Sequence, residues 1–175
     1  MKLYHHIAKE ASDAGQEFIL SGDSAGGNLA LSLPLYILQD QQALSPTKIV
    51  AIVPVCTTDT TILTEVAPND PALSPELFDL MREQWASKWG GDDPRISPLY
   101  ADLSVLAKRG VEVFILCAGT DCCAPGQMLM LDKLDKSGVQ GVFCYWPHMQ
   151  HLSFALWGLG IKDFSKYADW FFKQY

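Results

Sequence analysis

The stretch that decides the fold is Phe18-Ile-Leu-Ser-Gly-Asp-Ser-Ala-Gly-Gly-Asn28, an apolar run that ends at a serine between glycines. The pattern Gly-x-Ser-x-Gly between a strand and a helix is typical of a nucleophile elbow, which exposes the serine at the carboxyl end of a sheet. The glycines let the strand and helix backbones approach, because they carry no Cβ. The pattern predicts Ser24 as a nucleophile and the Ala25 N–H, at a helix start, as an oxyanion donor. A plain glycine-rich turn is the alternative.

Short apolar runs separated by helical stretches indicate the fold class. The runs are rich in Val, Ile and Phe and do not alternate apolar with polar residues, as is typical of strands buried on both faces of a parallel sheet. They cover residues 17–21, 48–55, 111–117 and 140–146. Strands alternating with helices predict an α/β fold, a parallel sheet of about four strands flanked by helices.

Helix signals lie between and after these runs. Residues 25–39 are apolar almost all round, which predicts an interior helix that Pro34 kinks. Ser74 and Pro75 predict a helix start, and Gly138 predicts the end of another helix. The predicted apolar faces of the later helices are Leu77, Met81, Trp85 and Trp89; Met128, Leu131 and Leu134; and Phe164, Tyr167 and Phe171. Trp85 and Trp89 either pack in the core or line a substrate pocket.

Composition excludes several classes of protein. The net charge of −7 and the lack of a Lys/Arg cluster argue against nucleic acid as a partner. No apolar run reaches the ~18 residues of a membrane span, and the first residues lack the apolar segment of a secretory signal. The five cysteines are odd in number and have no metal-ligand spacing, so we expect free thiols, with Cys117 and Cys144 buried. These features predict, by default, a cytoplasmic protein.

An elbow serine needs an acid and a base later in the chain, in the order Ser…Asp/Glu…His. Asp121 follows the run 111–117, and His151 follows the run 140–146. Two other residues remain as alternatives, His148 for the base and Asp59 for the acid. Asp59 lies in Thr-Thr-Asp-Thr, where a local turn is the competing interpretation. The adjacent pair His5-His6 suggests a metal site only superficially, since neighbouring residues on a helix point apart.

The sequence resembles the hormone-sensitive lipase branch of the α/β-hydrolase esterases, which includes arylacetamide and steryl-ester deacetylases. The resemblance rests on Gly22-Asp-Ser-Ala-Gly-Gly-Asn28, Ile96-Ser-Pro-Leu-Tyr-Ala-Asp-Leu103, Ala118-Gly-Thr-Asp121 and Met149-Gln-His151, and on their spacing. It implies that Ser24 attacks a carboxylic ester, that His151 moves the proton, and that Asp121 orients His151. It implies a small-molecule ester substrate and no metal or cofactor.

One departure from the family concerns the oxyanion site. The family has a His-Gly-Gly-Gly-type stretch well before the serine, whereas the 23 residues before Ser24 contain none. We therefore expect residues 1–175 to form a single α/β-hydrolase-like domain that lacks the N-terminal part of the family fold. Two hypotheses follow: a serine esterase of acyl or acetyl esters, or a truncated homologue without catalysis, a binding or regulatory module or a non-functional fragment. The first strand would also present a bare edge, which predicts self-association.

Overall fold

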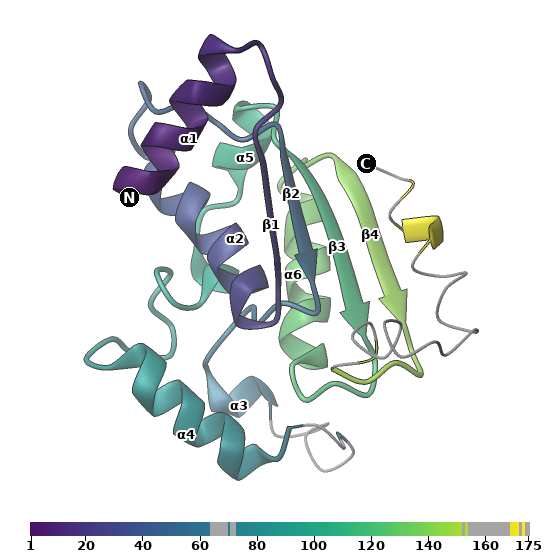
Figure 1. The fold of residues 1–175 in the computed structure, drawn as a ribbon. Coiled ribbons are helices and arrows are strands. Elements are labelled where there is room, and N and C mark those ends of the chain that lie inside the picture. Colours follow the sequence, from purple (N-terminus) through teal and green to yellow (C-terminus); the bar gives the residue numbers. More distant parts are fainter. Residues whose placement is uncertain (64–69, 71–72, 152, 154–168, 172, 174–175) are drawn as a thin grey trace.

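The computed structural model describes residues 1–63, 70, 73–151, 153, 169–171 and 173. Its centre is a parallel sheet of four strands in the order β1-β2-β3-β4 (Figure 1). The strands are β1 (Ile19–Asp23), β2 (Lys48–Ile52), β3 (Glu112–Ala118) and β4 (Gly141–Trp146). The predicted fold class, a parallel sheet of neighbouring strands flanked by helices, is confirmed.

Two strand ends differ from the prediction. Strand β1 continues to Asp23, so the sheet reaches directly to the elbow serine. Strand β2 ends at Ile52, because Val53 has a φ of 40°, which a β-branched residue rarely adopts. This bend turns the chain toward the carboxyl edge of the sheet.

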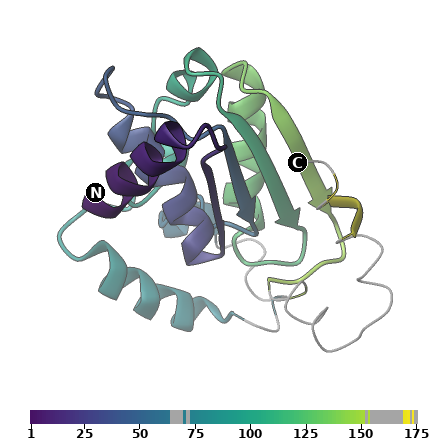
Figure 2. The same cartoon turned by 45° about the horizontal axis from the view of Figure 1, so that its top comes forward.

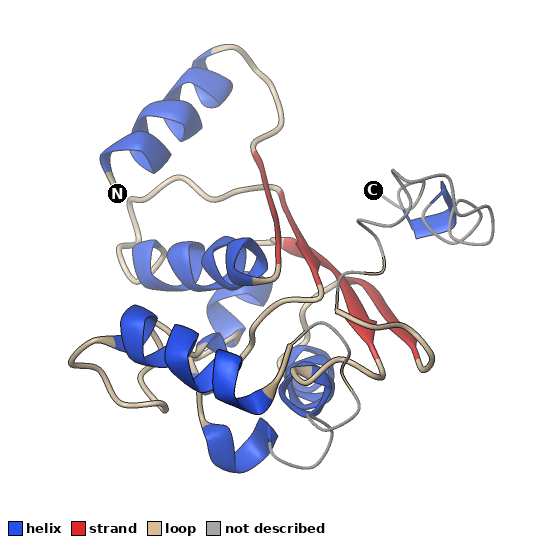
Figure 3. Ribbon diagram, turned by 60° about the horizontal axis from the view of Figure 1, so that its bottom comes forward, coloured by secondary structure: helices blue, strands red, loops and turns tan. Residues whose placement is uncertain are grey.

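Alternate residues of the central strands build two separate cores. Ile49, Ala51, Val113 and Ile115 face a large cluster that includes side chains of the helices. Val50, Ile52, Phe114 and Leu116 face a smaller cluster that includes the fully buried Phe171. Figure 3 shows α1, α2 and α6 on one side of the sheet and the helical stretch at 169–171 on the other. The middle of the sheet is therefore covered on both faces, as its continuous apolar runs predict.

Besides the stretch at 169–171, seven helical segments connect or flank the strands in the described part of the chain. They are α1 (Lys2–Asp13), α2 (Ala25–Ile37), α3 (Thr60–Leu63), α4 (Pro75–Ala86), a 3₁₀ turn (Pro98–Tyr100), α5 (Ser104–Lys108) and α6 (Ala124–Lys136). Figure 2, turned from the view of Figure 1, again shows α4 lying away from the strands. None of the described helices is long and apolar enough to cross a bilayer.

The expected interior position of α2 is only partly right. Leu31 and Leu35 are buried against the sheet, but Leu29 and Tyr36 are half-exposed. The helix packs on one face of the sheet and is not enclosed on all sides. Pro34 lies inside the helix, and its carbonyl still accepts a hydrogen bond from the Leu38 N–H at 2.8 Å.

Helix α4 begins as predicted but presents a different face. The Ser74 hydroxyl accepts a hydrogen bond from the Leu77 N–H at 3.2 Å, and Pro75 takes the first helical position. Leu77, Met81 and Trp85 lie on its exposed side, whereas Phe78 and Ala86 are buried. The four-residue spacing identifies this stripe without giving its direction, and the structure places it away from the core. Trp89 lies beyond the helix end, 4.6 Å from the Arg95 guanidinium.

Two further helix predictions have different outcomes. Helix α6 runs to Lys136 and is followed by Gly138 with a φ of 72°, so the predicted end is confirmed. Of the predicted C-terminal stripe, Phe164 and Tyr167 lie outside the described residues. Phe171 is fully buried.

Strand β1 is paired only with β2 among the described strands. The Phe18 carbonyl accepts from the Thr47 N–H at 2.8 Å, and the Ser24 N–H donates to the Ile52 carbonyl at 2.9 Å. In a parallel strand, the N–H and C=O of one residue point to the same neighbouring strand, and those of the next residue point to the opposite edge. Ile19, Ser21 and Asp23 thus direct their backbone groups to the open edge.

We propose that this edge pairs with β1 of a second copy, antiparallel about a two-fold axis at Ser21. We expect light scattering on the 175-residue chain to give a mass above the monomer that rises with concentration. Ile19→Lys, which puts a charge at the edge, should restore the monomer. Leu3→Lys on α1, also at an exposed apolar residue, is the matched control and should not. A wild-type monomer at every concentration would contradict the proposal.

Candidate active site

Ser24 forms the bend between β1 and α2. Its φ of 52° and ψ of −117° are strained for a residue with a side chain, and such a conformation costs of order 1–3 kcal/mol. Backbone hydrogen bonds hold it in place: its N–H donates to Ile52 at 2.9 Å, and its carbonyl accepts from the Val55 N–H at 3.2 Å. The strain is therefore maintained by β2 and the residues that follow it.

Gly22 and Gly27 allow the strand and helix to cross at this bend. A Cβ on Gly22 would lie 2.3 Å from the backbone carbon and oxygen of Gly26. A Cβ on Gly27 would lie 3.2 Å from the Gly22 carbonyl oxygen of the strand and 2.9 Å from the Pro54 Cβ. Helix α2 has no side-chain cap at its N-terminus, and the first N–H groups of a helix lack intrahelical acceptors. The Ala25 N–H is one of these groups.

The structure brings Ser24, Asp121 and His151 together at the carboxyl edge of the sheet. His151 Nδ1 lies 2.7 Å from Asp121 Oδ2, and His151 Nε2 lies 2.7 Å from Ser24 Oγ. Asp121 is fully buried and His151 nearly so, while Ser24 is partly exposed. This order of atoms lets the imidazole take the serine proton while the carboxylate faces the positive charge that develops.

The loops that carry Asp121 and His151 are tied to each other. The Thr120 N–H and hydroxyl donate to the Met149 carbonyl at 2.9 and 2.6 Å. The Gly119 N–H donates to the Trp146 carbonyl at 2.8 Å, and a Cβ at Gly119 would lie 2.5 Å from the Pro147 oxygen. The Ala-Gly-Thr-Asp and Met-x-His stretches therefore form one hydrogen-bonded unit.

The two alternative residues lie in other surroundings. His148 is exposed. Asp59 makes hydrogen bonds to Thr61 and to the Tyr100 hydroxyl, and these bonds, that of the Thr61 side chain first, lower the pKa of Asp59. The structure thus supports the local-turn interpretation of Asp59. Neither His148 nor Asp59 belongs to the hydrogen-bonded series Asp121–His151–Ser24.

Sequence reasoning missed two buried polar side chains at the site. Gln127 Nε2 donates to Asp121 Oδ2 at 2.9 Å. Asn28 Nδ2 donates to the carbonyls of Val55 at 2.6 Å and Ile96 at 2.7 Å, and so joins two of the stretches that carry the family resemblance. Gln127 could have been noticed as a polar residue in the apolar stripe with Met130 and Leu134, which are both buried.

All five cysteines are free and buried, as expected for Cys117 and Cys144. Asp121, Cys123 and His151 each place one possible metal-ligand atom within 4.8 Å of the others. The Cys122 side chain, burial and the Asp121 charge raise the pKa of the Cys123 thiol well above its usual range, so it stays protonated. Since His151 and Asp121 also bond each other, the chemistry of this group fits a proton relay better than a metal site. His5 and His6 are both exposed on α1.

A small recess of about 30 Å³ opens beside the elbow. Ala25, Val55, Phe78 and Trp85 are among the side chains that line it. The recess has room for about one water molecule. It is therefore a narrow, mostly apolar hollow next to the oxyanion donor, the Ala25 N–H. Trp85 therefore lies at the site, whereas Trp89 does not line this recess.

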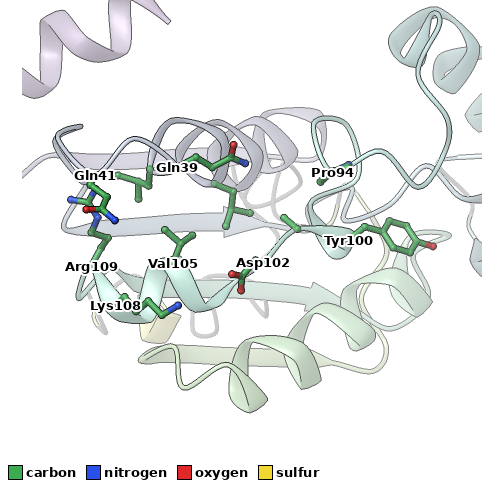
Figure 4. A pocket seen from close by; sticks show the side chains of 11 residues that line it. Gln39, Gln41, Pro94, Tyr100, Asp102, Val105, Lys108 and Arg109 are labelled. Carbon is green, nitrogen blue, oxygen red and sulfur yellow. The ribbon is translucent and has the colours of Figure 1, made fainter.

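A larger cavity of about 610 Å³ lies elsewhere, between the end of α2 and the α5 segment (Figure 4). Lys108 and Arg109 lie at one end of it, and Pro94 and Tyr100 lie at the other. The Arg109 guanidinium is occupied by the Asp40 and Ala43 carbonyls at 2.9 and 3.4 Å. None of Ser24, Asp121 and His151 lines this cavity, so it is separate from the candidate active site.

Comparisons with known proteins agree with the observed fold. A sequence model of the alpha/beta hydrolase fold matches residues 1–155. A putative acetyl-hydrolase, LipR of Mycobacterium tuberculosis, is 37% identical over 93 residues, which are 50% of this chain and 29% of LipR. A hormone-sensitive lipase from a metagenome library has a TM-score of 0.77 and 23% identity, over 95% of this chain and 58% of that structure. The hormone-sensitive lipase homologue EstE7 has a TM-score of 0.76 and 24% identity, over 94% and 58%.

The chain belongs to the alpha/beta hydrolase fold family. The expected α/β-hydrolase family is thus confirmed, and the predicted class, a hydrolase, agrees with it. The two hormone-sensitive lipase structures share the fold of this chain. The chain spans 58% of the length of these two solved structures and 29% of the length of LipR.

Proposed function

We propose that the chain carries the catalytic side chains of a serine hydrolase that cleaves carboxylic esters. The observation that carries the proposal is the hydrogen-bonded series from Asp121 through His151 to Ser24, with both distances at 2.7 Å. A serine in a strained bend at a helix N-terminus, with an imidazole on its hydroxyl, is an activated nucleophile.

In the proposed mechanism, Ser24 Oγ attacks the ester carbonyl carbon while His151 Nε2 takes the hydroxyl proton. The negative charge on the carbonyl oxygen is met by the Ala25 N–H and the positive end of α2. The tetrahedral intermediate collapses, the bond to the alcohol breaks, and His151 returns the proton to the leaving oxygen. Water, activated by His151, then releases the acyl group from Ser24 as a carboxylic acid.

The proposed substrates are acyl or acetyl esters of small or apolar alcohols. Two observations support this class. The recess beside Ala25 is lined largely by apolar side chains, including Phe78 and Trp85, and it is small. The relative LipR is named as a putative acetyl-hydrolase. A short acyl group beside the oxyanion donor fits both observations.

A second candidate is a binding or regulatory module without turnover. It concerns the oxyanion site, where the elbow of the given residues supplies the Ala25 N–H at the start of α2. Loss of one oxyanion donor typically costs about 10²–10³ in turnover. A chain that reacts with a strong phosphorylating agent but does not turn over an ester would fit this candidate.

The experiment that tests the proposal is reaction of the purified chain with a fluorophosphonate probe, followed by peptide mass spectrometry. We expect one adduct, on Ser24, because His151 raises the nucleophilicity of this hydroxyl alone. Hydrolysis of p-nitrophenyl acetate in the same preparation separates an esterase from a non-catalytic module. No adduct on folded protein, or an adduct only on other residues, would contradict the proposal.

A further inference from the structure

We infer that Gln127 is a positioning residue for Asp121: its side-chain amide holds the carboxylate in the orientation that meets His151. This inference rests on the proposed function, because it assigns a support to the same triad. Gln127 lies on α6, is fully buried, and touches neither Ser24 nor His151 by any hydrogen bond of the described structure.

The orientation of the Gln127 amide is fixed by two backbone groups. Its Oε1 accepts from the Ala118 N–H at 3.1 Å, and its Nε2 donates to the Pro54 carbonyl at 3.3 Å. If the amide were flipped, its NH₂ group would face the Ala118 N–H and its oxygen would face the Pro54 carbonyl, and both hydrogen bonds would be lost. Only one orientation of the amide therefore satisfies both backbone groups. The remaining Nε2 proton then points at Asp121 Oδ2, which lies 2.9 Å away.

Asp121 consequently has both of its carboxylate oxygens held. Oδ1 accepts from the Cys123 N–H at 2.8 Å, and Oδ2 accepts from both Gln127 and His151. With one donor on Oδ1 and two on Oδ2, the carboxylate cannot rotate without losing a bond in a buried site. Gln127 thus helps to set the plane in which the carboxylate meets the imidazole.

Gln127 also joins the acid to the segment that holds the nucleophile. Pro54, whose carbonyl it contacts, comes directly before Val55, whose N–H bonds the Ser24 carbonyl. Ala118, its other backbone partner, ends β3. The ladder already pairs β2 with β3. The buried amide adds a side-chain link from these strand ends to Asp121, and so connects the acid to the segment that holds Ser24.

The test compares Gln127→Met, which keeps the side-chain length but cannot donate, with the matched control Gln140→Met. Gln140 is exposed and makes a 3.4 Å bond to the Gly138 carbonyl. We expect Gln127→Met to lower the rate of fluorophosphonate labelling by about 10- to 100-fold, the effect of one hydrogen bond to a charged group. The far-downfield proton NMR signal of His151 Nδ1–H should shift or broaden. Gln140→Met should change neither.

A double-mutant cycle separates positioning from general packing. In an Asp121→Asn background, Gln127→Met should cause little further loss of labelling rate, because Gln127 acts through Asp121. An equal fold-loss in both backgrounds, or an unchanged rate and NMR signal in folded Gln127→Met, would overturn the inference.

The positioning role can still be tested if Gln127→Met does not fold, or if the proposed function is wrong. If Gln127→Met does not fold, the Nε2 proton signals of Gln127 are compared between wild type and Asp121→Asn; the inference requires them to shift, and unchanged signals overturn it. If wild type does not label but these signals and that of His151 respond as expected, the proposed function fails while the positioning role stands.

Discussion

Ser24→Ala is expected to lower kcat/KM for p-nitrophenyl acetate, and the rate of fluorophosphonate labelling, to the background of the unfolded protein. Loss of a nucleophile in a triad of this kind costs about 10⁴- to 10⁶-fold, because the group that forms the covalent bond is gone. Ser21→Ala is the matched control, since Ser21 lies in β1 three residues earlier and is exposed. It should keep the wild-type rate. An active Ser24→Ala would mean that another residue is the nucleophile.

The two histidines of the same loop give a companion comparison. His151→Gln removes the base that lies 2.7 Å from Ser24 Oγ, and should cost about as much as Ser24→Ala, because triad members act as a unit. His148→Gln should have little effect, since His148 is exposed. If His148→Gln abolished activity and His151→Gln did not, the base would be His148, and the contact between His151 and Ser24 would not be the catalytic one.

Gly22→Ala is expected to destabilise the fold strongly, whereas Gly26→Ala is not. A Cβ at Gly22 would lie 2.3 Å from two backbone atoms of Gly26, and a backbone cannot move aside as a side chain can. We expect a loss at or above the upper end of the about 1–3 kcal/mol typical of overpacking. A Cβ at Gly26 meets nothing within 4 Å, and alanine favours a helix by roughly 0.5–1 kcal/mol over glycine.

The measurement for this pair is the free energy of unfolding in urea, with loss of circular dichroism as the signal. Labelling of Gly22→Ala by the fluorophosphonate should fall as well, because the crossing of β1 and α2 sets the conformation of Ser24. Equal stability of the two variants would show that the helix can shift at the elbow, and that close contact does not hold the bend.

The sheet could be predicted from the sequence because its signals are local. The Gly-x-Ser-x-Gly stretch and the apolar runs identify the strands and the elbow, and the order of Asp121 and His151 after later strands places them at the same edge. The strand ends were less accurate, because Val53 leaves the strand through its backbone conformation and not through its side chain. The direction of the stripe on α4 stayed open, since spacing alone does not say which layer a helix meets.

The sequence by itself determined the fold class, the family and the three side chains that the structure brings together, because each is encoded by residue type and order. Only the tertiary structure decided what supports them. Gln127 is 6 residues from Asp121 on the chain, but Pro54, its third partner, is 73 residues from Gln127. Asn28 reaches Ile96 across 68 residues. Such contacts depend on how helices pack at the carboxyl edge of the sheet, and no local pattern encodes a hydrogen bond between groups that only folding brings within hydrogen-bond distance.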